Sequence, residues 1–135
     1  MSGLSTQNLP LVLVVDDDPD VLDMLSHVLR ARRFRVLTAA DTDTALLLCQ
    51  EHDGRIDALV ADLSMPGDLQ GRLAREVAAA YPGITIVFCT GIPRYIAVAT
   101  GLVRPDATYL DKPVNPDVLE GTLRTALKAR SAKRP

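Results

Sequence analysis

The stretch Leu11-Val12-Leu13-Val14-Val15-Asp16-Asp17-Asp18-Pro19 decides the fold of this chain. Its apolar run is short and rich in valine, and it stops abruptly at acidic residues and a proline. Such a run is typical of a strand that is buried on both faces, as in a parallel sheet. Asp18-Pro19 then predicts the start of a helix, because proline is tolerated in the first helical turn.

The rest of the chain alternates in the same way between short apolar runs and amphipathic segments. We expect strands at 11–15, 34–38, 56–61, 84–89 and 107–110. We expect helices at 19–29, from 42 to about 49, and at 73–80, 94–103 and 116–129. This alternation predicts an α/β fold, a doubly wound five-stranded parallel sheet with helices on both faces. The simplest strand order is the flavodoxin-like 2-1-3-4-5.

Length and composition fit one folded domain. The chain has 135 residues, of which 47% are hydrophobic and 24% charged, so it can bury a core without disulfide or metal support. We expect a flexible N-terminal segment at 1–9, the domain at 10–130 and a flexible tail at 131–135. The net charge of −2 argues against a strongly basic nucleic-acid coat.

The sequence also bears on the cellular location of the protein and on whether it binds membranes or nucleic acid. The chain has no apolar run long enough for a transmembrane helix, and its first residues do not resemble a secretory signal, so we expect no membrane association. Two isolated cysteines, Cys49 and Cys89, are too few for a disulfide framework or a zinc site, which favours a reduced cytoplasmic compartment. The sequence shows neither a recognition-helix pair nor a basic face, so we expect no direct binding of nucleic acid.

Polar side chains follow four of the predicted strands at the point where each strand ends. They are Asp16-Asp17-Asp18, Asp62, Thr90-Gly91 and Lys112-Pro113. The carboxyl ends of parallel strands lie at one edge of the sheet, so carboxylates, a hydroxyl and an ammonium group should converge there.

This set of groups suits phosphoryl chemistry beside a metal ion. Carboxylates held close together repel one another unless a cation intervenes, and Mg²⁺ prefers carboxylate, carbonyl and water oxygens. A lysine counters negative charge, and a threonine beside a glycine leaves space for an anion. Asp62 is the candidate nucleophile, because aspartate can form an acyl phosphate.

Each of these residues also has a simpler explanation. Asp18 is expected to cap the first helix. Taken singly, Asp62 is explained as a solvated loop residue and Lys112 as a surface lysine before a turn. Thr90-Gly91 is equally well explained as a simple turn. Their joint placement at the ends of predicted strands favours a single site.

The chain resembles the receiver domain of two-component response regulators over roughly residues 10–130. Four motifs carry the resemblance: Val14-Val15-Asp16-Asp17-Asp18-Pro19, Asp62-Leu63-Ser64-Met65-Pro66-Gly67, Thr90-Gly91 and Tyr109-Leu110-Asp111-Lys112-Pro113. Their order, spacing and strand context agree with that family. A stand-alone receiver and a receiver cut from a longer regulator or hybrid histidine kinase both remain open.

The resemblance implies a role for each matching residue. Asp62 matches the phosphoacceptor, and the metal (Mg²⁺ or Mn²⁺) would be held by Asp16, Asp17, Asp62 and the backbone carbonyl of Ser64. Thr90 and Lys112 match the residues that contact the phosphoryl group. Thr90 and Tyr109 match the switch residues, and the Lys112–Pro113 peptide bond is often cis in the family.

The resemblance also implies a function and partners. The domain would be a phosphorylation-controlled signalling switch rather than an enzyme, although it takes part in its own phosphorylation and slow dephosphorylation. Its donor would be a histidine kinase or a histidine phosphotransfer protein. The output would be a change in the face formed by the fourth helix, fifth strand and fifth helix, toward an unknown effector or a phosphorylation-dependent homodimer.

Three departures from the family pattern stand out. The loop 67–71 is one residue longer than the common form, and Asp106 stands where the family usually has glycine. Ser64 and Ile92 lie at positions that, in the family, tune the lifetime of the acyl phosphate, and Ile92 is apolar. Because an apolar side chain there hinders the attacking water, we expect slow self-dephosphorylation.

Two other functions are weighed against the switch. A haloacid-dehalogenase-like phosphatase also uses an aspartyl phosphate, but the stretch Asp16-Asp17-Asp18-Pro19-Asp20 lacks the final Thr or Val of that pattern, and no cap domain is visible. A receiver-like scaffold that is never phosphorylated would be marked by loss of an acidic residue or the lysine, and all of these are present.

Two further features are assigned no function. His27 lies on the first predicted helix and lacks the surroundings of a phosphotransfer histidine. Basic residues gather near residues 30–35 and 124–134, where we expect solvated segments.

Overall fold

The computed structural model describes residues 8–68 and 71–133, in which strands and helices alternate. The elements are β1 (Leu11–Val15), α1 (Pro19–Ala31), β2 (Arg35–Ala39), α2 (Thr42–Glu51), β3 (Ala58–Ala61), α3 (Arg72–Ala80), β4 (Thr85–Thr90), α4 (Arg94–Ala99), β5 (Thr108–Asp111) and α5 (Pro116–Lys133). The predicted alternation is therefore confirmed. Of the flexible segments predicted at 1–9 and 131–135, residues 1–7 and 134–135 lie outside the described residues.

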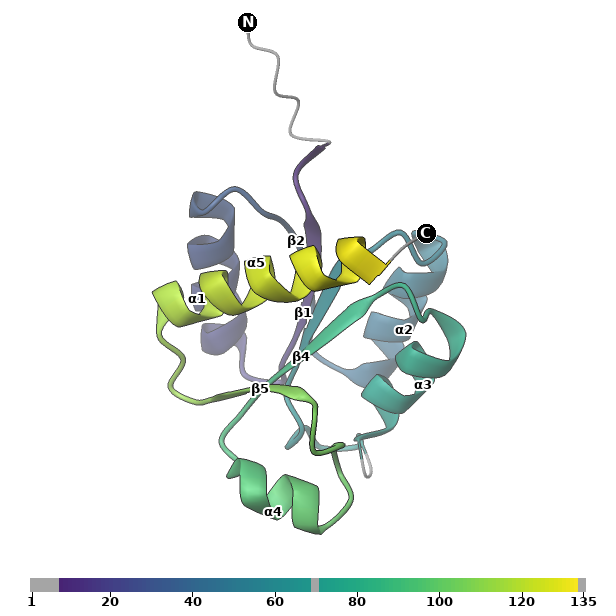
Figure 1. The fold of residues 1–135 in the computed structure, drawn as a ribbon, viewed down its shortest axis with the longest axis vertical. Helices are drawn as coiled ribbons and strands as arrows, with labels where there is room; N and C mark the ends of the chain where they lie inside the picture. Colours follow the sequence, from purple (N-terminus) through teal and green to yellow (C-terminus); the bar gives the residue numbers. More distant parts are fainter. Residues whose placement is uncertain (1–7, 69–70, 134–135) are drawn as a thin grey trace, which may run out of the picture.

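The strands form one parallel sheet in the order β2-β1-β3-β4-β5, as predicted (Figure 1). The strand β2 lies on one side of β1, and the chain then crosses over so that β3 lies on the other side of β1. This reversal makes β1 and β3 central neighbours, with Val15 paired to Ala61 at their carboxyl ends. The residues that follow β1, β3, β4 and β5 therefore meet at one edge of the sheet.

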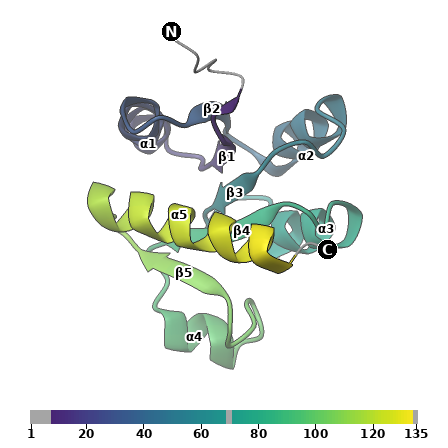
Figure 2. The ribbon, with the colours of Figure 1, turned by 45° about the horizontal axis from the view of Figure 1, so that its top comes forward.

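Helices cover both faces of the sheet (Figure 2). The pair α1 and α5 packs on one face, and the pair α2 and α3 on the other. Successive strand residues point to opposite faces, so Leu13 of β1 packs toward α2 and α3, and Val14 packs toward α1 and α5. Both side chains are fully buried, which explains the continuous apolar run.

The helix α4 is shorter than predicted, ending at Ala99 rather than at residue 103. The hydroxyl of Thr100 donates to the carbonyl of Ile96, and Gly101 follows with a φ of 77°. A left-handed glycine directly after the last turn terminates a helix, because it turns the chain away from the helix axis. The sequence signal for this early end is Gly101 itself.

The bounds of several other elements also differ from the prediction, most of them by one or two residues. The strand β3 begins at Ala58, two residues later than expected. The helix α5 continues to Lys133, so the predicted tail at 131–135 is helical over 131–133. Among the described residues, no helix combines the length and apolar character needed to cross a membrane.

Candidate functional site

Asp16 and Asp62 lie side by side directly after the central strands β1 and β3. The backbone N–H of Asp62 donates to the carbonyl of Val15 over 3.2 Å, which continues the sheet pairing past the strand ends. Each of the two carboxylate side chains is only 3% exposed. Two buried acids at such close quarters need a cation, because their charges otherwise repel in a poorly solvated site.

Lys112 supplies that positive charge from the end of β5. Its ammonium group donates to Asp16 Oδ2 over 2.5 Å and to Asp62 Oδ2 over 2.8 Å. The backbone N–H of Lys112 donates to the carbonyl of Thr90, so the lysine is fixed to the neighbouring strand β4. The Lys112–Pro113 peptide bond is cis, as the resemblance implied.

Asp17 completes a group of three acids. A carboxylate oxygen from each of Asp16, Asp17 and Asp62 lies within 4.8 Å of the other two. Asp17 is exposed, whereas the other two are buried. The donor set therefore fits a hard divalent cation, which prefers carboxylate and water oxygens and can enter from the exposed side. These three residues would hold the ion.

Local hydrogen bonds fix the orientation of the buried acids. Asp16 Oδ1 accepts the backbone N–H of Asp18 over 2.9 Å. Asp62 Oδ1 accepts both the backbone N–H and the hydroxyl of Ser64, over 3.0 and 2.9 Å. Asp18 itself caps α1 by accepting the N–H of Asp20, which confirms the simpler explanation for that residue.

The electrostatics of the site keep Asp62 ionised at neutral pH. Burial acts to raise the pKa of Asp62, but hydrogen bonds from Lys112, from Ser64 and from Thr90 lower it below its ordinary value. Burial likewise acts to lower the pKa of Lys112, but its bonds to Asp16 and Asp62 raise it overall. The site thus contains an ionised carboxylate held against an ionised ammonium group.

Thr90 and Tyr109 are linked through the backbone of Ile92. Thr90 ends β4 and is fully buried, and its hydroxyl accepts the N–H of Ile92 over 3.3 Å. The hydroxyl of Tyr109 donates to the carbonyl of the same residue. Tyr109 also packs against Phe88, with the ring centroids 6.3 Å apart. A shift at Thr90 can therefore reach Tyr109 through a single residue.

Sequence reasoning missed Asp68 and Thr42. Asp68 is buried in the loop between β3 and α3, and its carboxylate accepts the hydroxyl of Thr42 and the N–H of Leu73. An acidic residue a few positions before a helix is a capping signal, which points to the bond with Leu73. The longer loop at 67–71 is a departure noted from the sequence, but its residues 69–70 lie outside the described part of the chain.

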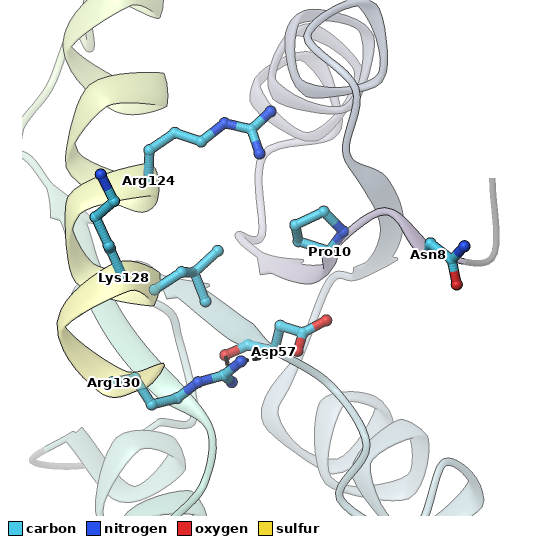
Figure 3. A pocket seen from close by; sticks show the side chains of 7 residues that line it. Asn8, Pro10, Asp57, Arg124, Lys128 and Arg130 are labelled. Carbon is cyan, nitrogen blue, oxygen red and sulfur yellow. Dashed lines mark hydrogen bonds and ion pairs between the residues drawn. The ribbon is translucent and has the colours of Figure 1, made fainter. Parts of the chain in front are cut away.

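The opposite edge of the sheet holds a basic cavity of about 320 Å³ (Figure 3). Arg130 from α5 donates to the carboxylate of Asp57 over 3.0 Å and to the carbonyl of Gly83 over 3.1 Å. Arg124 lies 4.2 Å from the ring centroid of Phe34. These arginines pack α5 against the strand ends, so this basic segment is structural as well as solvated. The cavity lies away from the acidic group.

The other features without an assigned function are surface features. His27 is exposed on α1. Of the basic residues near 30–35, Arg32 pairs with Asp117 and Glu120 on α5 over 2.7 and 3.0 Å. Positive φ angles at non-glycine residues occur at Arg33 and Asp53 among the described residues, so Asp106 needs no glycine-like backbone.

Comparisons with known proteins agree with this arrangement. The chain matches the family described as the response regulator receiver domain over residues 12–124. It is 34% identical over 117 residues to the DNA-binding response regulator MtrA of Mycolicibacterium smegmatis, a match that covers 87% of this chain and 50% of the relative. The chain thus spans about half the length of that relative.

Two solved structures share the fold. A response regulator receiver domain protein from Clostridium thermocellum superposes with a TM-score of 0.83 at 24% identity, covering 93% of this chain and all of that one. The chemotaxis protein CheY4 of Vibrio cholerae superposes with a TM-score of 0.73 at 30% identity, covering 87% and 98%. With the family match over residues 12–124, these likenesses show that the chain belongs to the receiver domain family of response regulators.

Proposed function

We propose that this domain is a phosphorylation-controlled signalling switch in which Asp62 accepts a phosphoryl group. The observation that carries the proposal is the position of the Asp62 carboxylate, between two further acids and the ammonium group of Lys112. The donor is a phosphohistidine on a histidine kinase or a histidine phosphotransfer protein. The P–N bond of the donor breaks, and a P–O bond to the Asp62 carboxylate forms.

The side chains of the site divide the work of this transfer. Asp16, Asp17 and Asp62, with the backbone carbonyl of Ser64, would hold Mg²⁺ or Mn²⁺. That ion, when bound, neutralises charge on the phosphoryl oxygens. Lys112 pairs with a phosphoryl oxygen, and the lowered pKa of Asp62 keeps its carboxylate ionised and ready to attack. The phosphoryl group ends on the domain's own Asp62, so we propose a regulatory rather than an enzymatic role.

The output follows from Thr90 and Tyr109. A phosphoryl group brings nearly two negative charges and strong acceptor oxygens to Asp62. The Thr90 hydroxyl moves to donate to them, and its bond to the N–H of Ile92 changes. Because Ile92 also accepts the hydroxyl of Tyr109, the change reaches the surface of α4, β5 and α5. This surface meets the effector or a second copy of the domain.

The proposed setting is the cytoplasm. Cys49 and Cys89 are both free and buried, and unpaired thiols suit a reducing compartment. We propose that the domain itself does not contact nucleic acid or membrane.

The test is the intact mass of the protein after incubation with acetyl phosphate and Mg²⁺. One added phosphoryl group is expected for the wild type, and none for Asp62→Asn or in the presence of a metal chelator. A folded wild-type protein that gains no mass and does not bind beryllofluoride would instead be a receiver-shaped interaction scaffold.

A further inference from the structure

We propose that Asp68 is a positioning residue for the metal site. Its buried carboxylate fastens the loop that carries Asp62 and Ser64 to the first turns of α2 and α3, and so sets the affinity of the site for a divalent cation. This inference rests on the proposed function, because it takes the site to be one for Mg²⁺ or Mn²⁺.

The contacts of Asp68 are those of a buried anchor. The residue is 5% exposed, although it lies in a loop. One of its oxygens, Oδ1, accepts the hydroxyl of Thr42 over 2.6 Å and the backbone N–H of Leu73 over 2.9 Å. A carboxylate withdrawn from water needs such donors. Its own N–H donates to the carbonyl of Met65 over 3.2 Å, which closes the loop on itself.

Both partners of Asp68 belong to rigid elements. Thr42 is the first residue of α2, and Leu73 is the second residue of α3. Thr42 is 6% exposed and Leu73 only 1% exposed. The N–H of Leu73 has no partner within its own helix at this position, and Gly71, the residue before α3, supplies no side-chain cap. Asp68 therefore caps α3 from within the loop and ties it to α2.

This anchor lies close to the metal ligands along the chain. The segment from Asp62 to Asp68 is fixed at one end by β3 and at the other by Asp68, and the buried side chains of Leu63 and Met65 hold it on either side of the exposed Ser64. The contacts of Asp68 add to these attachments in setting the position of the Ser64 carbonyl. Replacing a group that hydrogen-bonds to a metal ligand commonly changes metal affinity by about 10- to 100-fold, and Asp68 acts one step further out, through the loop that carries Ser64.

The helices α2 and α3 also offer a matched control. Arg72 of α3 donates to Asp43 of α2 over 3.1 Å, so this ion pair joins the same two helices. Asp43 is exposed and Arg72 is half-buried, and within the described part of the chain Arg72 pairs with Asp43 and Glu76 rather than with Asp68. If Asp68 acted only by holding the two helices together, losing the Arg72–Asp43 pair would resemble losing Asp68.

The experiment measures binding of free Mn²⁺ to the whole chain by electron paramagnetic resonance. We expect Asp68→Ala and Thr42→Val to weaken Mn²⁺ binding about tenfold or more. Thr42→Ser keeps the hydroxyl and should bind as the wild type does, and so should Arg72→Gln. In the metal-free proteins, hydrogen exchange at the Ser64 amide should speed up only in the first two variants.

The outcomes separate this inference from the proposed function. If Asp68→Ala and Thr42→Val bind Mn²⁺ with wild-type affinity while folded, the positioning role is wrong and the proposed function stands. If the wild type itself binds no Mn²⁺, both are wrong. Where circular dichroism finds Asp68→Ala unfolded, the comparison of Thr42→Val with Thr42→Ser decides.

Discussion

The ammonium group of Lys112 lies 2.8 Å from a carboxylate oxygen of Asp62, although the two residues are 50 positions apart in the chain. The same nitrogen also contacts Asp16, so a single positive charge is shared between two buried acids. A divalent cation at the acidic group would take over part of that task. The stability of the protein without metal should therefore depend on Lys112 more than its stability with metal does.

Replacement of this lysine tests the relation. Lys112→Gln should destabilise the metal-free protein by roughly 1–3 kcal/mol, because two close carboxylates lose their counter-charge. Added Mg²⁺ should raise the Tm of the variant more than that of the wild type. Lys128→Gln, at an exposed lysine of α5, serves as the control and should behave as the wild type. Equal Mg²⁺-induced shifts in Tm for Lys112→Gln and the wild type would contradict the argument.

The lowered pKa of Asp62 predicts that the free energy of unfolding depends on pH in the acidic range. A carboxyl group whose pKa in the folded state lies below its ordinary value of 3.8 stabilises the fold above that value. This contribution is lost as the pH falls through the folded-state pKa. The free energy of unfolding of the wild type should therefore fall relative to that of Asp62→Asn between about pH 5 and pH 3.

Denaturant unfolding of both proteins across that range checks this. Because the amide side chain introduced by Asp62→Asn does not titrate, the difference between the two curves isolates Asp62. A difference that stays constant or moves the other way on acidification would mean that the pKa is not lowered.

The side chain at position 92 should control how long the phosphoryl group survives. Ile92 is apolar and half-buried, and its N–H donates to the Thr90 hydroxyl, so we expect its side chain to hinder water from attacking the proposed acyl phosphate. We expect Ile92→Glu to shorten the lifetime of phosphorylated Asp62 severalfold, measured by the decay of the added mass. Ile96→Glu, on the surface of α4, should leave the lifetime unchanged. An unchanged lifetime in Ile92→Glu would refute this role.

The two thiols should be inert in the folded protein. Burial raises the pKa of Cys89 to about 11 and also raises that of Cys49. Neither side chain is more than 2% exposed. At pH 8 a thiol reagent such as dithionitrobenzoate should label neither residue in native protein and both in denaturant. Rapid labelling of the native protein would show that the core opens locally.

Truncation in the central strand should be costly. Leu13 is fully buried in β1, and Leu13→Ala should lower the free energy of unfolding by about 2–5 kcal/mol. Leu47 of α2 is 54% exposed, and Leu47→Ala should change the free energy of unfolding by no more than about 0.5 kcal/mol. Urea denaturation measures both, and similar losses would show that burial does not govern the cost.

Much of the site could be predicted because parallel topology places strand ends together. Once the Leu11–Val15 stretch is read as a buried strand, the alternation of elements brings Asp16, Asp62 and Lys112 to one edge without any knowledge of side-chain packing. The registers of β3 with β4 and of β4 with β5 align the strand ends, and the long Lys112 side chain then reaches Asp62. The helix cap at Asp18 follows from local sequence alone.

Other contacts could not be predicted, because they depend on the path of a loop. The bond from Thr42 to Asp68 joins residues 26 positions apart, and neither lies in a strand whose register could place it. The contact between Arg130 and Asp57 depends on the angle at which α5 crosses the sheet, which composition does not set. The helix α4 ends early because of Gly101, but a glycine within a weakly helical segment does not by itself predict where the helix ends.

The strand order determines when the site can be completed during synthesis of the chain. Asp16 is near the start of the chain, Asp62 near its middle, and Lys112 is contributed by the last strand, 96 positions after Asp16. A nascent chain that has emerged from the ribosome only as far as α4 lacks the ammonium group that pairs with Asp16 and Asp62. The proposed phosphorylation site and the sheet are therefore completed together, so we expect an incomplete chain not to be phosphorylated.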